Sequence, residues 1–132
     1  VVALVHAARE STNGQITAKV VHRLAEEFGS KPSDLLVAFG PAIRAESYVY
    51  DERIYKLVTA EWKPHLKPIG PGQIMVDNIG YNRAQLIASG VLDKHISDPG
   101  LDTGQNSEYY SHVRASKAGQ PEGRLAAVVA LR

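Results

Sequence analysis

Short apolar runs punctuate the chain and predict buried strands. They are rich in aliphatic residues and cover residues 1–5, 35–39, 74–76 and 125–131. Runs of this length and composition are typical of strands buried within a sheet. Another short strand is expected near residues 94–97, and residues 42–50 are expected to be extended. Residues 63–72 hold three prolines and two glycines and are predicted to form a loop.

Three segments between these runs carry helical periodicity. An amphipathic helix is predicted from Gly14 to Gly29, because apolar residues recur at every fourth position: Ile16, Val20, Leu24 and Phe28. A second helix is predicted to start with Asp51 as its N-cap and to bury one stripe of side chains: Ile54, Leu57, Val58 and Trp62. A third helix is predicted over residues 79–89 and is expected to end at Gly90. Asp77 is predicted to cap its start, and Asn82 and Arg83 are predicted to lie on its surface.

The order of these elements indicates the fold class. Strands and helices interleave, which predicts an α/β (α+β) fold in which helices cover a mixed β-sheet. The 132 residues suffice for a core, since a chain of this size buries roughly two thirds of its unfolded surface. Residues 1–132 are therefore predicted to form a single domain.

Charge and composition exclude several kinds of partner and chemistry. The 15 Lys and Arg nearly balance the 14 Asp and Glu, so the formal net charge is +1. This balance gives no electrostatic footprint for nucleic acid or an anionic membrane. The chain has no cysteine and so no disulfide or thiolate ligand of its own, and no apolar run approaches the ~20 residues that span a bilayer. We therefore predict a cytoplasmic protein that binds neither nucleic acid nor a membrane.

Five blocks of residues, spread over the whole chain, resemble one family of proteins. They are Val5-His6-Ala7 with Thr12, Gly14 and Ile16; Gly40-Pro41-Ala42-Ile43; Asp77 with Asn82-Arg83-x-Gln85-Leu86 and Gly90-Val91; Tyr109-Tyr110-Ser111 with Arg114; and Gly123-Arg124. In order and spacing they resemble the C-terminal half of laccase-domain proteins, zinc-dependent purine-nucleoside enzymes once described as polyphenol oxidoreductases. The resemblance implies a laccase-domain-like fold for this chain.

The resemblance also implies a zinc site that this chain holds only in part. The family's zinc triad is a His from a Q-V-H-G segment, a Cys from an A-D-C segment and the His of V-H-A. Only the last is carried over, onto His6, because the others lie upstream of the matched region. A catalytic zinc usually needs three protein ligands, so His6 binds zinc only with ligands from outside this chain. Without the resemblance, a lone His at a strand end is more often a structural residue.

The block near the C-terminal end predicts a site for an anion. Arg114, with Ser111 and Tyr110, is predicted to bind substrate, because a guanidinium offers a planar fork for phosphate and a hydroxyl adds a donor. The alternative is a surface arginine in a polar loop. Asp98 and Asp102 are interpreted as turn-forming residues in preference to paired carboxylates for acid–base chemistry.

Some positions depart from the family pattern and leave the function open. The segment Ala8-Arg9-Glu10-Ser11 stands where the family has G-W-R-G, and Asp102-Thr103 stands where it has C-T. The first hypothesis is part of a zinc-dependent purine nucleoside phosphorylase or adenosine deaminase, acting on a purine nucleoside with phosphate or water. The second is a catalytically degenerate homologue that serves as a binding or assembly module. A copper-dependent polyphenol oxidase is least favoured, because the chain has five His and no Cys.

A partial family fold has a physical consequence for association. If half of the family's sheet is absent, the strand beginning at Val1 and its neighbours present unpaired edges or an exposed apolar face. We therefore expect a tightly associated second chain or self-association.

Overall fold

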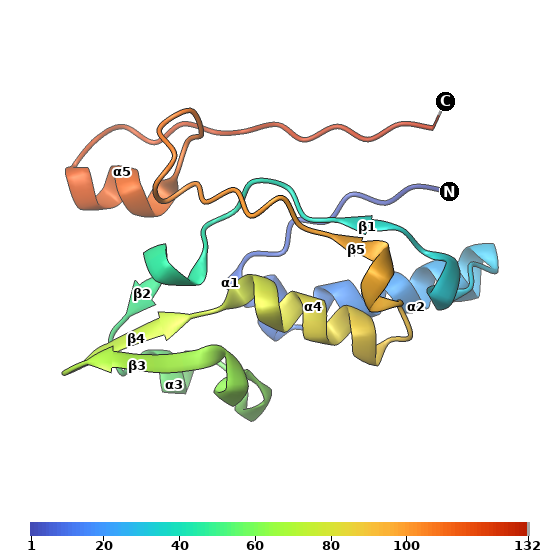
Figure 1. Cartoon of the computed structure of the whole chain (residues 1–132), viewed down its shortest axis with the longest axis horizontal. Coiled ribbons are helices and arrows are strands. Elements are labelled where there is room, and N and C mark those ends of the chain that lie inside the picture. Colours follow the sequence, from blue (N-terminus) through green and yellow to red (C-terminus); the bar gives the residue numbers. More distant parts are fainter. Residues whose placement is uncertain (132) are drawn as a thin grey trace.

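The computed structural model describes residues 1–131 as short helices and strands that interleave along the chain (Figure 1). The helices are α1 (Arg9–Asn13), α2 (Ile16–Phe28), α3 (Ile54–Leu57), α4 (Asn78–Ala88) and α5 (His112–Ala118). The strands are β1 (Val37–Ala38), β2 (Val49–Tyr50), β3 (Leu66–Gly70), β4 (Gln73–Val76) and β5 (Ile96–Ser97). Four 3₁₀ turns connect them at Pro32–Asp34, Ala45–Ser47, Ala60–His65 and Asp93–His95.

The strands form two small sheets, one parallel and one antiparallel. β1 pairs with β5 in parallel, with Val37 opposite Ile96. The other sheet has the order β2–β4–β3, and both of its pairings are antiparallel. The chain thus has the mixed strands and helices of the predicted α/β (α+β) class.

Two helices adjoining these sheets follow the predicted local signals. α2 ends at Gly29, which adopts the left-handed conformation with φ 64°. α4 starts after Asp77, whose carboxylate accepts a hydrogen bond from the Gly80 amide at 2.7 Å. The C-terminal end of α2 and the N-terminal end of α4 are thus capped by the residues that the sequence indicates.

Apolar side chains form a core on each side of α4. One cluster joins α3, the Ala60–His65 turn, β4 and α4, and consists of Ile54, Trp62, Ile74, Val76 and Tyr81. The other joins α2, α4 and β5, and consists of Val21, Leu86, Val91 and Ile96. α4 therefore contributes to both clusters and links the two sheets.

The predicted loop over residues 63–72 is wrong, because β3 lies within it. Residues of β3 pair with β4, and the pairing becomes irregular between Pro68 and Gly70. β3 is an edge strand, where a proline is tolerated because its missing N–H is not needed for a second neighbour.

The predicted helix that starts at Asp51 is also wrong in its extent. α3 begins only at Ile54 and ends at Leu57, and the following 3₁₀ turn carries Trp62. Asp51 instead accepts hydrogen bonds from the backbone amide and side chain of Arg53. Ile54 and Trp62 are fully buried, as the stripe predicts, whereas Leu57 is exposed.

Residues 1–5 and 125–131, here named the terminal apolar segments, do not form the buried strands predicted for them. Both are extended without a strand assignment, and Leu4 and Val128 are 61% and 91% exposed. Figure 1 shows both segments reaching the same end of the molecule. An apolar run becomes a buried strand only where a neighbouring strand pairs with it, and the described residues supply none here.

Within residues 1–131, no helix combines the length and apolar character needed to cross a bilayer. The cytoplasmic location stays a prediction.

Candidate functional site

His6 lies at the entrance to α1, in a turn whose backbone is held by other side chains. The His6 side chain is exposed. Ser11 Oγ lies 2.9 Å from the His6 carbonyl oxygen and 3.0 Å from the Ala8 carbonyl oxygen, and its single hydroxyl hydrogen is shared between these two acceptors. Asn78 Nδ2 donates to the Ala7 carbonyl oxygen at 2.8 Å. Consecutive carbonyl groups are thus fixed from both α1 and α4, so the backbone that carries His6 has a defined position.

A buried polar network joins α1, α2 and α4 directly beneath this turn. Asn82 Nδ2 donates to Thr12 Oγ1 and to the Asn78 carbonyl oxygen, both at 2.8 Å. Gln85 Nε2 donates to the Thr12 carbonyl oxygen, and Thr17 Oγ1 donates to Gln85 Oε1, also at 2.8 Å. All five side chains are buried, and Thr12 and Asn82 have no exposed surface. The prediction that Asn82 lies on the helix surface is therefore wrong.

Other polar contacts tie α1 to the antiparallel sheet. Asn13 Oδ1 accepts hydrogen bonds from Trp62 Nε1 at 3.0 Å and from the Thr59 amide at 2.9 Å. The Arg9 guanidinium lies 5.9 Å from the centre of the Tyr50 ring, within the range of a cation–π contact. α1 is thus held by polar and aromatic groups on several sides, and it positions His6 at its N-terminal end.

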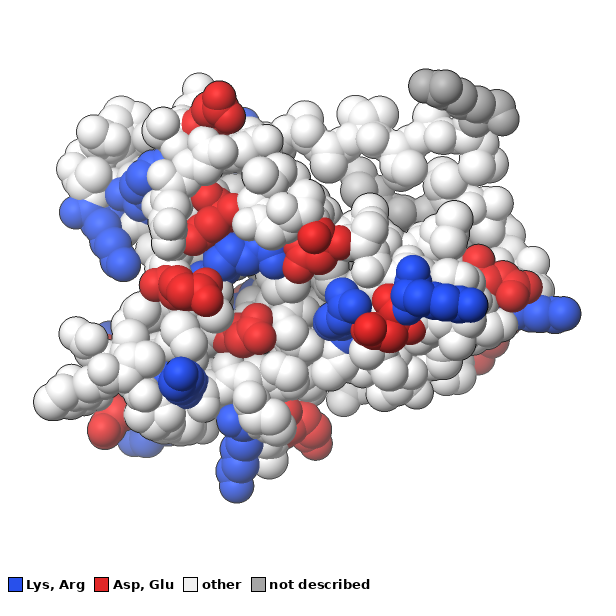
Figure 2. All heavy atoms as spheres, viewed as in Figure 1, with Lys and Arg blue, Asp and Glu red and all other residues white. Residues whose placement is uncertain are grey.

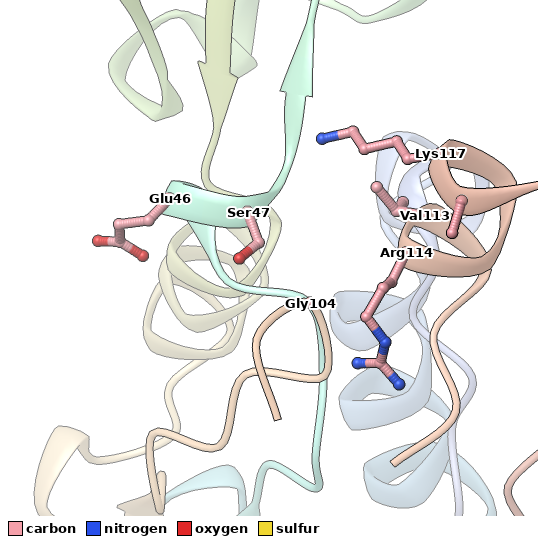
Figure 3. A pocket seen from close by; sticks show the side chains of 7 residues that line it. Glu46, Ser47, Gly104, Val113, Arg114 and Lys117 are labelled. Carbon is pink, nitrogen blue, oxygen red and sulfur yellow. The ribbon is translucent and has the colours of Figure 1, made fainter. Parts of the chain in front are cut away.

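A hollow of about 460 Å³ lies between α5 and the 3₁₀ turn Ala45–Ser47. Its lining includes Glu46, Ser47, Arg114 and Lys117. In Figure 3 the Lys117 side chain extends from α5 toward the side that carries Ser47, whereas Glu46 points away from Lys117. Two positively charged side chains thus line the hollow, and they extend from α5 in different directions (Figure 3).

Several N–H donors of the Arg114 guanidinium are already hydrogen-bonded within the protein. Its terminal nitrogens donate to the carbonyl oxygens of Thr103, Asn106 and Tyr109. These bonds organise the loop that leads to α5. In this arrangement only the remaining N–H groups of the guanidinium are free to donate to an anion. Lys117 is the second positively charged residue that lines the hollow.

Ser111 and Tyr110 lie beside Arg114 but outside the lining of the hollow. Ser111 is buried and caps α5, since its Oγ accepts from the Arg114 amide at 3.3 Å. Tyr110 is exposed, and its ring leaves no room for a side chain at Gly123, where a Cβ would lie 2.1 Å from the ring. The Tyr110 ring thus packs against the backbone at Gly123.

Asp98 and Asp102 form turns, as predicted, and also hold Arg44. Asp98 accepts from the Gly100 amide at 3.0 Å and pairs with the Arg44 guanidinium, and this hydrogen bond lowers the pKa of Asp98. Burial by itself raises the pKa of Asp102, but hydrogen bonds from Ser47 and from the Arg44 and Gly104 amides outweigh it and the pKa is lowered. Both groups are ionised near neutral pH, which fits ion pairing and turn formation.

The described residues form no complete metal site. In residues 1–131, no three His, Cys, Asp or Glu side chains are grouped so as to hold a metal ion. A catalytic zinc usually needs three protein ligands. A zinc ion at His6 therefore does not fit this chain alone and requires ligands from outside it.

The residues predicted from sequence do not meet in one place. Arg114 lines the hollow, whereas His6 is not among its lining residues. The sequence prediction missed the role of Asn78 and of the network beneath it. A signal was available, because Asn78, Asn82 and Gln85 follow helical spacing and form a polar row along one face of α4.

The distribution of surface charge does not by itself indicate a binding site at either His6 or the hollow beside α5. Figure 2 shows acidic and basic side chains interspersed on the face that it displays. No field of a single sign extends across that face, so recognition of an anion depends on local groups such as Arg114 and Lys117.

The fold and the five sequence blocks together define a laccase-like α/β chain. The chain belongs to the family described as multi-copper polyphenol oxidoreductase laccase, which matches residues 1–132. The resemblance predicted from the sequence is thus confirmed.

Relatives in two bacteria bear the same name. The chain is 32% identical over 117 residues to the purine nucleoside phosphorylase YlmD of Bacillus subtilis (strain 168), a match that covers 86% of this chain and 42% of that protein. It is 34% identical over 99 residues to the purine nucleoside phosphorylase YlmD of Geobacillus stearothermophilus, covering 72% of this chain and 36% of that protein. The chain thus spans less than half the length of these relatives.

Two crystal structures share the fold. YlmD from Geobacillus stearothermophilus superposes with a TM-score of 0.71 at 31% identity, over 80% of this chain and 41% of that one. The hypothetical protein YfiH of Bacillus licheniformis gives a TM-score of 0.70 at 24% identity, with the same coverage. These matches confirm the predicted fold class.

Proposed function

We propose that this chain is part of a purine nucleoside phosphorylase, with an active site completed by polypeptide outside these 132 residues. The observation that carries the proposal is the identity of 32% over 117 residues to a relative with that activity in its name. The chain covers 42% of that relative, which supports a shared site and not a self-contained one. The substrates are then a purine nucleoside and phosphate.

Phosphorolysis places clear demands on such a site. A phosphate oxygen forms a bond to C1′ of the ribose while the bond between C1′ and the purine nitrogen breaks. The purine leaves with that electron pair and takes up a proton. The site must therefore hold phosphate close to the sugar and support the departing base.

Residues of this chain meet part of these demands. Arg114 and Lys117 carry the positive charge of the hollow beside α5, and we assign phosphate binding to this region, with Ser111 and Tyr110 supporting Arg114. His6 supplies one zinc ligand when other ligands come from outside the chain. A bound zinc ion supplies Lewis acidity, as in other zinc enzymes.

The second candidate is a catalytically degenerate homologue that acts as a binding or assembly module. Two observations favour it. Glu10, at the position of the family's arginine, has a side chain that is 87% exposed, and the guanidinium of Arg114 already donates to three carbonyl oxygens. A copper-dependent polyphenol oxidase stays the least favoured reading, since the chain has no Cys and five His.

The proposed partner is a second polypeptide or a second copy of this chain. The exposed terminal apolar segments support this proposal, because large apolar patches on a surface mark sites of association. A polypeptide that covers them would also be placed to complete the site at His6, which directly follows the first segment.

The proposal is tested by assaying the natively purified protein, with its zinc content and native mass measured alongside. Inosine and adenosine are incubated with and without phosphate, and the free base, ribose 1-phosphate and deaminated nucleoside are separated by chromatography. Phosphate-dependent release of base that is lost in His6→Ala but kept in His22→Ala supports phosphorolysis; His22 is an exposed residue of α2. Release of ammonia without phosphate indicates a deaminase. Intact nucleosides in a zinc-loaded assembly favour the degenerate homologue.

A further inference from the structure

We propose that Asn78 is a positioning residue for His6, an inference that rests on the proposed role of His6 in the active site. Asn78 is the first residue of α4, and it lies far from His6 in sequence. Its Nδ2 donates to the Ala7 carbonyl oxygen at 2.8 Å. This bond joins α4 to the carbonyl group of the residue that directly follows His6.

The orientation of the Asn78 side chain follows from its neighbours. Its Nδ2 faces the Ala7 carbonyl oxygen, and the neighbouring Asn82 Nδ2 faces the Asn78 carbonyl oxygen and Thr12 Oγ1. Rotating either amide would direct its oxygen toward a carbonyl oxygen, which is repulsive. Asn78 therefore acts as a donor toward the segment that carries His6, and Asn82 acts as a donor toward α1 and the first residue of α4.

In both asparagines the side-chain nitrogen is hydrogen-bonded, whereas the side-chain oxygen is not. Asn78 and Asn82 are 8% and 0% exposed, and the Oδ1 atoms of both have no hydrogen-bond partner among the described residues. A buried acceptor without a donor is unfavourable and calls for a compensating role. The compensating role that the geometry offers is to fix the Ala7 carbonyl group and, through it, His6.

The backbone beside His6 is held by hydrogen bonds and not by apolar packing. Its side chain is exposed, and α1, which follows it, buries only Thr12. Apolar packing therefore does not fix the turn at residues 6–8. Hydrogen bonds to its carbonyl oxygens do so instead. The Ala7 oxygen accepts from Asn78 Nδ2 at 2.8 Å and from Thr12 Oγ1 at 3.3 Å, and the His6 oxygen accepts from Ser11 Oγ. The bond from Asn78 is the shorter of the two at Ala7, and it is the one that comes from α4.

The test compares Asn78→Asp with Thr17→Val. Asn78→Asp keeps the side-chain volume and places an acidic residue in the first turn of α4, where it is favourable for the helix, but it removes the donor to Ala7. Thr17→Val breaks the bond from Thr17 to Gln85, which belongs to the same buried network but does not touch residues 6–8. Asn78→Ser serves as a second variant if the aspartate impairs folding.

The first readout is independent of catalysis: the backbone order parameter of the Ala8 amide, measured by ¹⁵N relaxation. We expect it to fall from about 0.85 to below about 0.6 in Asn78→Asp and to stay at the wild-type value in Thr17→Val. The second readout is kinetic. We expect kcat for phosphorolysis to fall about ten- to a hundredfold in Asn78→Asp, as for other changes to groups that orient a site residue, with KM changed less than about twofold.

Three results would overturn the proposal: an unchanged order parameter in both Asn78 variants, an equal loss of order in Thr17→Val, or a kcat loss that merely tracks stability in all variants. If the wild-type protein shows no phosphorolysis, the proposed function fails, while the order parameters still decide whether Asn78 positions the turn.

Discussion

Asn82 shows how much a single buried side chain contributes to this fold. It has no exposed surface and links Thr12 to α4 through its Nδ2 group. The sequence indicates a polar helical residue at this position but not its partner, because Thr12 lies 70 residues earlier. Local periodicity cannot reveal a hydrogen bond across that separation, and this is why its burial was not predicted.

Replacing Asn82 by Asp is expected to make stability depend on pH. The new carboxylate cannot make the hydrogen bonds that Asn82 Nδ2 donates to Thr12 Oγ1 and to the Asn78 carbonyl oxygen. Burial raises the pKa of this carboxylate above its value in the unfolded chain. At pH 7 the uncompensated charge is expected to destabilise the fold by about 3–5 kcal/mol, and stability should recover as the pH falls and the group is protonated. Urea unfolding between pH 4 and pH 8 measures this. Asn82→Ala, the uncharged control, should show no such recovery; an equal pH dependence in both variants would contradict the explanation.

Asp98 is expected to stabilise the fold at neutral pH and to lose this contribution on acidification, the opposite pH dependence to that of Asn82→Asp. Its hydrogen bond to the Arg44 guanidinium lowers its pKa, so its contribution is present above the unfolded pKa of about 4 and is lost as the pH falls through the lowered value. We expect Asp98→Asn to be less stable than wild type by about 1–2 kcal/mol near neutral pH and to lose less stability on acidification. Thermal unfolding from pH 7 down to pH 3 measures the difference. Parallel curves for both proteins would show that the pair contributes nothing to acid sensitivity.

At the scale of elements, local signals predict the ends of α2 and α4 better than they predict which extended segments find a partner. α2, its end at Gly29 and the Asp77 cap of α4 were predicted correctly, because periodicity and capping residues lie within the helix itself. β3 lies in a predicted loop, since its prolines conceal an edge strand whose partner is β4. The terminal apolar segments are predicted as buried strands from their composition, although the described residues offer them no strand to pair with. Of the site, the sequence predicted His6 and Arg114 but neither their separation nor the polar network.

Gly29 provides a test of the local signal that ends α2. Its φ of 64° is strained for other residues, although a Cβ there would meet nothing within 4 Å. Gly29→Ala is therefore expected to destabilise the fold by about 1 kcal/mol. Gly40→Ala is the matched control, because that position is equally open but lacks a positive φ. Urea unfolding monitored by the fluorescence of Trp62, the single tryptophan, measures both; an equal effect at the two glycines would show that backbone strain is not the cause.

At the scale of the whole molecule, the exposed apolar surface does not fit a chain that acts alone. Leu4 and Leu131 are 61% and 68% exposed, and Val128 is 91% exposed. The two terminal apolar segments reach the same end of the molecule (Figure 1). The relatives are more than twice as long as the part that this chain matches. Extended apolar segments that pair with no neighbouring strand can pair with a strand of another polypeptide.

We therefore expect the isolated chain to associate in a concentration-dependent manner, as measured by sedimentation velocity. Combining Leu4→Glu with Val128→Glu should shift it toward monomer, because charge on an unpaired edge opposes strand addition. Tyr55→Glu is the matched control: Tyr55 is also an exposed large side chain, at 48%, but it belongs to α3, away from the terminal segments (Figure 1), and its replacement should leave association unchanged. A wild-type chain that stays monomeric at every concentration, or a double variant that associates as strongly as wild type, would show that these segments are not the contact. The first result would also remove the main support for a second polypeptide at His6 and leave the degenerate homologue as the better-supported function.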